Sequence, residues 1–224
     1  GGRSSGKVAV FANPDGSLPG TEKEAAFLRS RAKDWKLQPE IYLRERATEV
    51  RLTSMASPDI LHVTTHGFFW PKSVGRANPM HRSGIILAKP KTGAKPPSEN
   101  DGTLTAAEAS LMKLKGTRIV MLSACQTGQG EVVDGEGVMG LRRAFIQAGT
   151  QNLVITLWVI YSGPSVTFMK QFYDRAMADG SASKALWSAQ RDLMVQSRKS
   201  GKTQKNDKAT LTAVKYFGAF VLSH

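Results

Sequence analysis

The chain has 224 residues, of which 41% are hydrophobic, and its formal net charge is +13. A chain of this length can bury a sizeable core as a single domain, which we assign to residues 7–224. No apolar run approaches the roughly 18 residues that a membrane-spanning helix needs, so we expect no membrane insertion. Residues 1–6 lack an initiating Met and a hydrophobic signal region, and we interpret them as a cloning scar or a linker cut from a longer polypeptide.

The single cysteine, Cys125, cannot form an internal disulfide, so nothing indicates an oxidising compartment and we expect a cytoplasmic protein. A lone thiol is either a small buried hydrophobe or a nucleophile. One cysteine, with histidines that lack metal-ligand spacing, argues against a zinc site. We expect neither a metal nor a cofactor.

The positive charge is compatible with a nucleic acid, a membrane surface or an acidic partner protein. Much of it, however, lies in scattered Lys and Arg side chains and in a basic stretch at about 197–209, which is typical of a solvated loop. No recognition motif or interleaved aromatic series accompanies the charge, so we do not expect this domain to bind nucleic acid. Nucleic-acid binding, if present, would weaken steeply with salt.

Apolar runs alternate with segments of helical periodicity along most of the chain. The expected strands are, in chain order, 7–13, 40–43, 60–65, 118–125, 153–158 and 216–222. The expected helices are 22–36, 44–55, 106–113, 134–149, 162–177 and 183–197. The runs VAVF, ILHV, IVML and LVITLW are continuous, as in parallel strands covered on both faces. The sequence therefore predicts an α/β fold with a mostly parallel sheet.

Short polar motifs mark the starts of three of these helices. Thr48 is a candidate N-cap. Thr105 and Glu108 have the spacing of a capping box. Ser162 followed by Pro164 is typical of a first helical turn.

Residues 68–103 differ from the rest because they are rich in Pro, Gly and basic side chains. Within them, 83–88 fits a short strand or a hairpin arm, and about 89–103 is a polar, Pro-rich loop. Long loops inside a compact domain are usually functional or disordered. Because this one separates His66 from Cys125 in sequence, we expect it to form a rim of a shared site or to change shape on activation.

Two apolar runs each lead to a reactive side chain and a glycine-bearing loop. One leads to His66 and Gly67, and the other to Cys125. In an open α/β sheet, functional groups gather beyond the carboxyl ends of the strands, so we expect the two on one rim. His66 would act as the base for a Cys125 nucleophile. The backbone N–H groups of Gly67 and Cys125 would stabilise an oxyanion.

A structural role is the usual explanation for either side chain taken alone, and the matching contexts of the two are what favour a site. His62 is the competing histidine, and its position in mid-strand predicts a core or supporting role. His81 lies in the Pro-rich segment and His224 is the last residue.

With these motifs in hand, the chain resembles CHAT domains, caspase-like cysteine peptidases usually found behind tetratricopeptide repeats, in the clan that also holds separase and the caspases. The matching segments are LHVTTHGFF (61–69), SGIILA (83–88), DGTLTAAEA (101–109), the long stretch 120–158 and YFGAFVLSH (216–224). The resemblance implies a caspase-like three-layer sandwich, a catalytic pair of His66 and Cys125, and a regulatory repeat region upstream. Some relatives cleave a gasdermin or a CRISPR-associated protein in bacterial defence, which is a family-level expectation for the partner.

The chain departs from its relatives where an acidic residue is expected near the substrate. Relatives usually follow the last central strand with a Trp-Pro-Val-Asp-Asp type sequence, whereas here Trp158 is followed by a segment that includes Tyr161 and Ser162. The position two before the cysteine, acidic in metacaspases, is Ser123. A basic substrate side chain would therefore lack a facing carboxylate, and we expect cleavage after a neutral, apolar or small residue. The loop after Cys125 can still supply an acid, from Glu131, Asp134 or Glu136.

The sequence is compatible with two functions. The first is a cysteine endopeptidase that cuts a specific partner protein. The second is a gated or inactive caspase-like module that binds a partner through its basic surface.

Overall fold

The computed structural model of the chain describes residues 4–70, 78–89, 100–126, 136–156, 162–201 and 219–224. Within these ranges eight strands form one sheet in the order β2-β1-β3-β6-β7-β8, with β4 beside β3 and β5 beside β4. The strands are β1 Lys7–Ala12, β2 Gln38–Leu43, β3 Ile60–Phe69, β4 Ser83–Ile86, β5 Thr103–Thr105, β6 Ile119–Gln126, β7 Leu153–Thr156 and β8 Phe220–Ser223. The helices are α1 Thr21–Ala32, η1 Arg44–Arg46, α2 Glu49–Thr53, η3 Pro79–His81, α3 Ala106–Ala109, α4 Glu136–Gln147, α5 Ser162–Asp179 and α6 Ala182–Gly201.

The sheet is mostly parallel, as the sequence predicted. Strands β2, β1, β3, β6 and β7 pair in parallel, and β8 closes this row as an antiparallel strand beside β7. The hairpin of β4 and β5 adds antiparallel pairing to the end of β3. Parallel neighbours bring their carboxyl ends to one edge of the sheet, which is where His66 and Cys125 lie.

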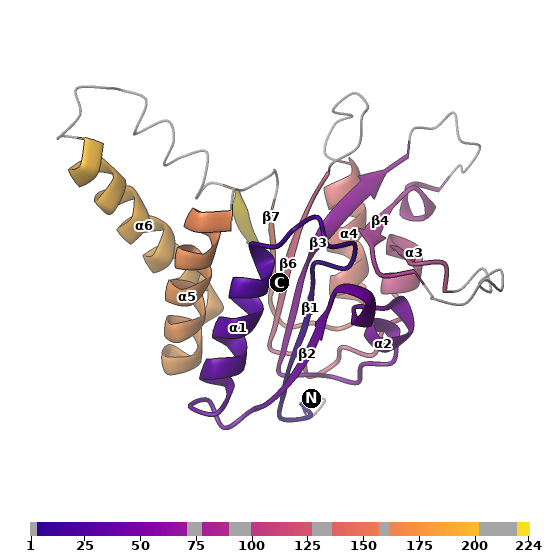
Figure 1. The fold of residues 1–224 in the computed structure, drawn as a ribbon, viewed down its shortest axis with the longest axis horizontal. Helices are drawn as coiled ribbons and strands as arrows, with labels where there is room; N and C mark the ends of the chain where they lie inside the picture. The colour runs from indigo at the N-terminus through magenta and orange to yellow at the C-terminus, as the bar shows by residue number, and fades with distance from the viewer. Residues whose placement is uncertain (1–3, 71–77, 90–99, 127–135, 157–161, 202–218) are drawn as a thin grey trace.

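Helices cover both faces of the sheet, which gives the three-layer arrangement seen in Figure 1. One apolar core joins the sheet to α1, α5 and α6, and a second joins its other face to α2, α3 and α4. Successive strand residues alternate between these cores. On β3, Ile60 belongs to the first core and Leu61 to the second; on β6, Met121 belongs to the first and Leu122 to the second. The same alternation assigns each later residue of β3 to one face of the sheet or the other. No helix in the described ranges is long and apolar enough to cross a bilayer.

Strand β3 is longer than expected. The sequence predicted a strand over 60–65 that ends before the histidine, but β3 runs from Ile60 to Phe69. Its last residues, Gly67 to Phe69, pair with β4 in antiparallel orientation and so continue the strand. His66 therefore lies inside a strand, close to the end of the parallel part of the sheet.

The predicted helix over 44–55 was wrong in extent. The chain forms η1, leaves helical geometry, and starts the short helix α2 at Glu49. Arg44 has a positive φ of 49°, which an α-helix does not accommodate. Thr48 does occupy the N-cap position, but its side chain makes no capping hydrogen bond.

Other boundaries were nearer to expectation. The capping box at Thr105 and Glu108 is confirmed, although α3 ends at Ala109. Helix α1 stops at Ala32, and α6 continues to Gly201, so the first residues of the expected basic loop are helical. Strand β5, which starts at Thr103, was not predicted. Residues 90–99 of the Pro-rich loop lie outside the described residues, and so do residues 202–218.

Candidate active site

The backbone of His66 pairs with that of Cys125 across the parallel strands β3 and β6. The same register pairs Thr64 with Ser123 and His62 with Met121. Because His62 faces α1 and α5, alternation places the side chain of His66 on that same face of the sheet. The two residues singled out from sequence are thus neighbours at one edge of the sheet.

Gly67, the expected oxyanion donor, is buried between β4 and β6. Its register partners are Ile85 on one side and Gln126 on the other. A Cβ added at Gly67 would lie 2.8 Å from the carbonyl oxygen of Ala124. Close packing of the two strands therefore requires glycine here, independently of any role in catalysis. The oxyanion role of Gly67 and Cys125 stays a prediction.

The loop between β1 and α1 reaches across to the histidine. The hydroxyl oxygen of Ser17 lies 2.6 Å from Nε2 of His66, and a carboxylate oxygen of Asp15 lies 3.6 Å from the same nitrogen. Ser17 also donates to Asp15, from its backbone N–H at 3.0 Å and from its hydroxyl at 2.7 Å. The imidazole is 20% exposed and the Asp15 side chain 42%. A carboxylate and a hydroxyl thus adjoin the candidate base.

Asp15 is held in its ionised form by this arrangement. Partial burial acts in the opposite direction, but the hydrogen bonds from Ser17 and the charge of His66 outweigh it and lower the pKa of Asp15 below its usual value. An ionised carboxylate accepts hydrogen bonds and donates none. This restricts where the hydrogen atoms between Asp15, Ser17 and His66 can lie.

Asn13 fixes the loop that carries Asp15 and Ser17. It has a positive φ of 52°, a conformation that Asn tolerates better than most residues, and this turns the chain away from the end of β1. Its side-chain oxygen accepts a hydrogen bond from the N–H of Leu18, and its amide group donates to Glu22 at 2.7 Å. Glu22 in turn accepts from Arg44 at 2.9 Å. The loop is therefore anchored to both α1 and the end of β2.

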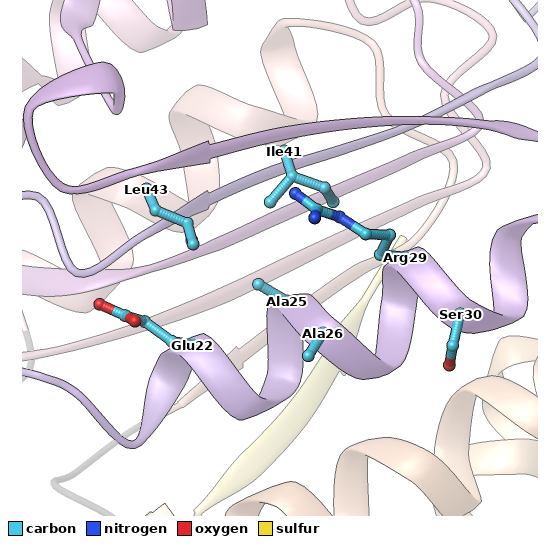
Figure 2. A pocket seen from close by; sticks show the side chains of 7 residues that line it. All are labelled: Glu22, Ala25, Ala26, Arg29, Ser30, Ile41 and Leu43. Atoms are coloured by element: carbon cyan, nitrogen blue, oxygen red, sulfur yellow. The ribbon is translucent and has the colours of Figure 1, made fainter.

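A cavity of about 270 Å³ lies between α1 and β2, beside this anchor. Figure 2 shows Glu22 at one end of it, near Leu43, and the guanidinium of Arg29 reaching toward Ile41. The remaining lining side chains are Ala25, Ala26 and Ser30. None of the residues predicted for the site lines this cavity, so we assign it no part in the chemistry.

His62 is fully buried beneath the candidate site, which confirms a core position for it. Its Nε2 lies 3.0 Å from a carboxylate oxygen of Glu24 on α1, and its Nδ1 lies 3.0 Å from the hydroxyl of Tyr173 on α5. Thr64 donates to the same Glu24 oxygen. Burial, followed by the charge of Glu24, raises the pKa of Tyr173 well above its usual value, so the hydroxyl stays protonated. The network ties two helices to β3 just below His66.

The other predicted site residues are described in part. Ser123 is half-buried on β6, two residues before Cys125. Glu136 is the first residue of α4, and Ser162 the first of α5. The remaining pocket residues lie outside the described ranges: Glu131, Asp134, Trp158 and Tyr161.

Sequence reasoning missed Asp15 and Ser17. They lie in the segment NPDGS, which has the composition of a turn and gave no other signal. Their position after the first strand of a parallel sheet was the available clue, because that loop opens on the same edge as His66. Asp15 is therefore a carboxylate separate from those predicted in the loop after Cys125.

Comparison with known proteins agrees with this architecture. A family model described as "CHAT domain" matches residues 2–222. Tetratricopeptide repeat protein 28 from Mus musculus and its counterpart from Homo sapiens are each 34% identical to this chain over 96 residues, which is 43% of the chain. That match spans 4% of each relative's own length. The match over nearly the whole chain, on a mostly parallel α/β sheet, shows that the protein belongs to the CHAT domain family, a family of caspase-like peptidases.

Proposed function

We propose that the protein is a cysteine endopeptidase in which His66 and Cys125 form the catalytic pair. The observation that carries this proposal is the parallel register of β3 and β6, in which the two residues are direct partners. Residues paired in this way on neighbouring strands share a face of the sheet, which suits proton transfer between a thiol and an imidazole. Family membership supports the same chemistry.

The reaction divides into two steps. The Cys125 thiol gives its proton to His66, and the thiolate sulfur bonds to the carbonyl carbon of the scissile peptide. The C–N bond then breaks as the imidazolium returns the proton to the departing amine. A water molecule, deprotonated by His66, hydrolyses the acyl-enzyme and regenerates the thiol. The N–H groups of Gly67 and Cys125 would stabilise the oxyanion in both steps.

We further propose that the substrate is a specific partner protein and that a repeat region controls access to it. The two curated relatives are named as tetratricopeptide repeat proteins, which supports such an association. A gasdermin-like or CRISPR-associated partner, and a role in bacterial defence, remain predictions from the family resemblance. The alternative is a module that binds a partner without cutting it.

A peptide library derived from a whole proteome tests the proposal without a known substrate. The library is incubated with wild-type protein, with Cys125→Ala and with the surface control Asp34→Asn, and new N-termini are identified by mass spectrometry. We expect wild type and Asp34→Asn to produce the same set of cleavages around one sequence preference, and Cys125→Ala to produce none. Identical cleavages with Cys125→Ala would contradict the proposal. Absence of cleavage in every sample, repeated with a longer protein that includes the proposed repeat region, would favour the binding module.

A further inference from the structure

The contact between Ser17 and His66 determines which ring nitrogen of the imidazole carries the hydrogen. Ser17 has one hydroxyl hydrogen and two close neighbours, Oδ1 of Asp15 at 2.7 Å and Nε2 of His66 at 2.6 Å. Asp15 is ionised and has no hydrogen to offer, so the Ser17 hydroxyl must donate to Asp15. The hydroxyl oxygen is then an acceptor toward His66. A contact of 2.6 Å is a hydrogen bond only if Nε2 carries a hydrogen.

We propose that Asp15 and Ser17 are positioning residues that hold His66 in the Nε2–H tautomer, so that Nδ1 exchanges the proton with Cys125. This inference rests on the proposed function for the role of Cys125. No proton leaves the Asp15–Ser17 pair during the reaction: the thiol proton moves to Nδ1 and from there to the leaving amine. When Nδ1 is protonated the ring is cationic, and the Asp15 carboxylate stabilises that charge from 3.6 Å.

In the part of the chain that the structure describes, the carboxylate of Asp15 adjoins His66, and the other charged groups nearby have partners of their own. Among the described residues, Glu22 on α1 is occupied by Asn13 and Arg44. Glu24 on α1 is bonded to His62 and Thr64 deeper in the core. Arg82, next to β4, lies over the ring of Phe69. Cys125 on β6 is the register partner itself.

The loop that presents Asp15 and Ser17 is built to hold their position. The side-chain oxygen of Asn13 accepts a hydrogen bond from the N–H of Leu18 within the loop. The backbone N–H of Asn13 donates to the carbonyl of Thr64 on β3. Strand β3 therefore carries His66 and is also bonded to the base of the loop that contacts it. Such an anchored second group is what a general base needs for a fixed tautomer and ring orientation.

The tautomer can be measured directly, without a substrate. The chain has 4 histidines, so long-range proton–nitrogen correlation spectra of ¹⁵N-labelled protein resolve each ring, and His66→Gln assigns the His66 signals. In the neutral ring of wild type we expect the Nε2–H form. Ser17→Ala should give a mixture of tautomers, Ser17→Thr should retain the Nε2–H form because it keeps the hydroxyl, and the exposed control Ser54→Ala should have no effect. A wild-type Nδ1–H ring, or a Ser17→Ala ring identical to wild type, overturns the inference.

The charge of Asp15 is tested through the thiol. Cys125 is the only cysteine, so its alkylation by iodoacetamide reports on one group. Asp15→Asn keeps the hydrogen-bond acceptor for Ser17 and removes the charge, and it should lower the alkylation rate at pH 7 by about three- to tenfold, a modest effect because Asp15 is partly exposed. Asp34→Asn should not change it. An Asp15→Asn rate equal to wild type removes Asp15 from the inference. If His66→Gln also leaves the rate unchanged, the catalytic pair itself fails, whereas the tautomer spectra still decide the role of Ser17.

Discussion

His66 and Cys125 are register partners on the parallel strands β3 and β6. The pairing continues for one more residue, Gly67 with Gln126, and β3 then carries on with β4 as its partner. The candidate pair therefore lies where the parallel sheet gives way to the hairpin. Strand geometry here fixes the separation of the two backbones, and anything that forces the strands apart should affect the site.

Gly67→Ala should separate these strands. Its Cβ would overlap the carbonyl oxygen of Ala124 at 2.8 Å, a backbone atom that cannot rotate away. We expect a loss of about 2 kcal/mol in the free energy of unfolding and slower alkylation of Cys125. Gly180→Ala is the control, because Gly180 has a φ of 69° and no atom within 4 Å of the added Cβ. It should cost about 1 kcal/mol through backbone strain and leave alkylation unchanged. Equal effects of Gly67→Ala and Gly180→Ala on the alkylation rate would show that strand separation does not control the reactivity of Cys125.

Tyr173→Phe should weaken the buried network under the site. The change removes the hydroxyl bonded to Nδ1 of His62, which is fully buried. A buried polar atom without its partner costs about 1–2 kcal/mol, which chemical denaturation can measure. Tyr42→Phe is the matched control, since its hydroxyl makes a long bond to Glu40 at a half-buried position. If Tyr173→Phe lowered the free energy of unfolding no more than Tyr42→Phe does, the network would contribute little stability.

Glu49 predicts a pH dependence of stability. Burial is the main cause that raises the pKa of this carboxyl from 4.5 to about 7, and the nearby charges of Glu108 and Asp101 add to it. The folded protein then binds the proton more tightly than the unfolded chain does, so stability is lost as the pH rises from about 4.5 through about 7. Glu49→Gln, which keeps an acceptor for the N–H of Gly102, should gain about 2 kcal/mol relative to wild type between pH 5 and pH 8.

Unfolding curves of wild type and Glu49→Gln at several pH values provide this measurement. The exposed neighbour Glu45→Gln serves as control and should follow the wild-type pH dependence. A constant difference between Glu49→Gln and wild type across the range would show that Glu49 titrates normally in the folded protein.

The central strands were predictable because burial on both faces leaves a continuous apolar signature. β1, β3, β6 and β7 all start within a residue of their expected positions, and the capping box at Thr105 was equally local. The extension of β3 through Phe69 was not predictable in this way, because it depends on pairing with β4, a contact that local periodicity does not reveal. The same holds for the failure of the helix at 44–55, where the chain adopts a positive φ at Arg44.

The residues of the candidate site also differ in whether local sequence could predict them. His66 and Cys125 were proposed from residue type and strand context, and the register makes their backbones neighbours. Asp15 and Ser17 were not identified, since 49 residues separate Ser17 from His66 and the loop has the composition of an ordinary turn. Position in the fold, not local sequence, brings them to the histidine.

The preference for a neutral residue at the cleavage position stays a prediction. The carboxylate of Asp15 lies beside the candidate site, but this group is already bonded to Ser17 and adjoins His66. Matched peptides that differ only at the cleavage position should therefore be cut faster with Leu or Met than with Arg or Lys. Faster cleavage after Arg or Lys would contradict the prediction. If Asp15→Asn then abolished that faster cleavage, Asp15 would be the group that binds the basic side chain.

The most direct test of the catalytic pair is the alkylation rate of Cys125 at pH 6, compared between wild type and His66→Ala. A free thiol with a pKa near 8.5 is less than about 1% thiolate at that pH, whereas a thiol paired with an imidazolium is ionised to a much larger extent. We expect iodoacetamide to modify wild type at least about tenfold faster than His66→Ala, with the two unfolded proteins reacting equally. Equal rates in the folded proteins would show that His66 does not activate Cys125, and the account of a cysteine peptidase built on this pair would be wrong.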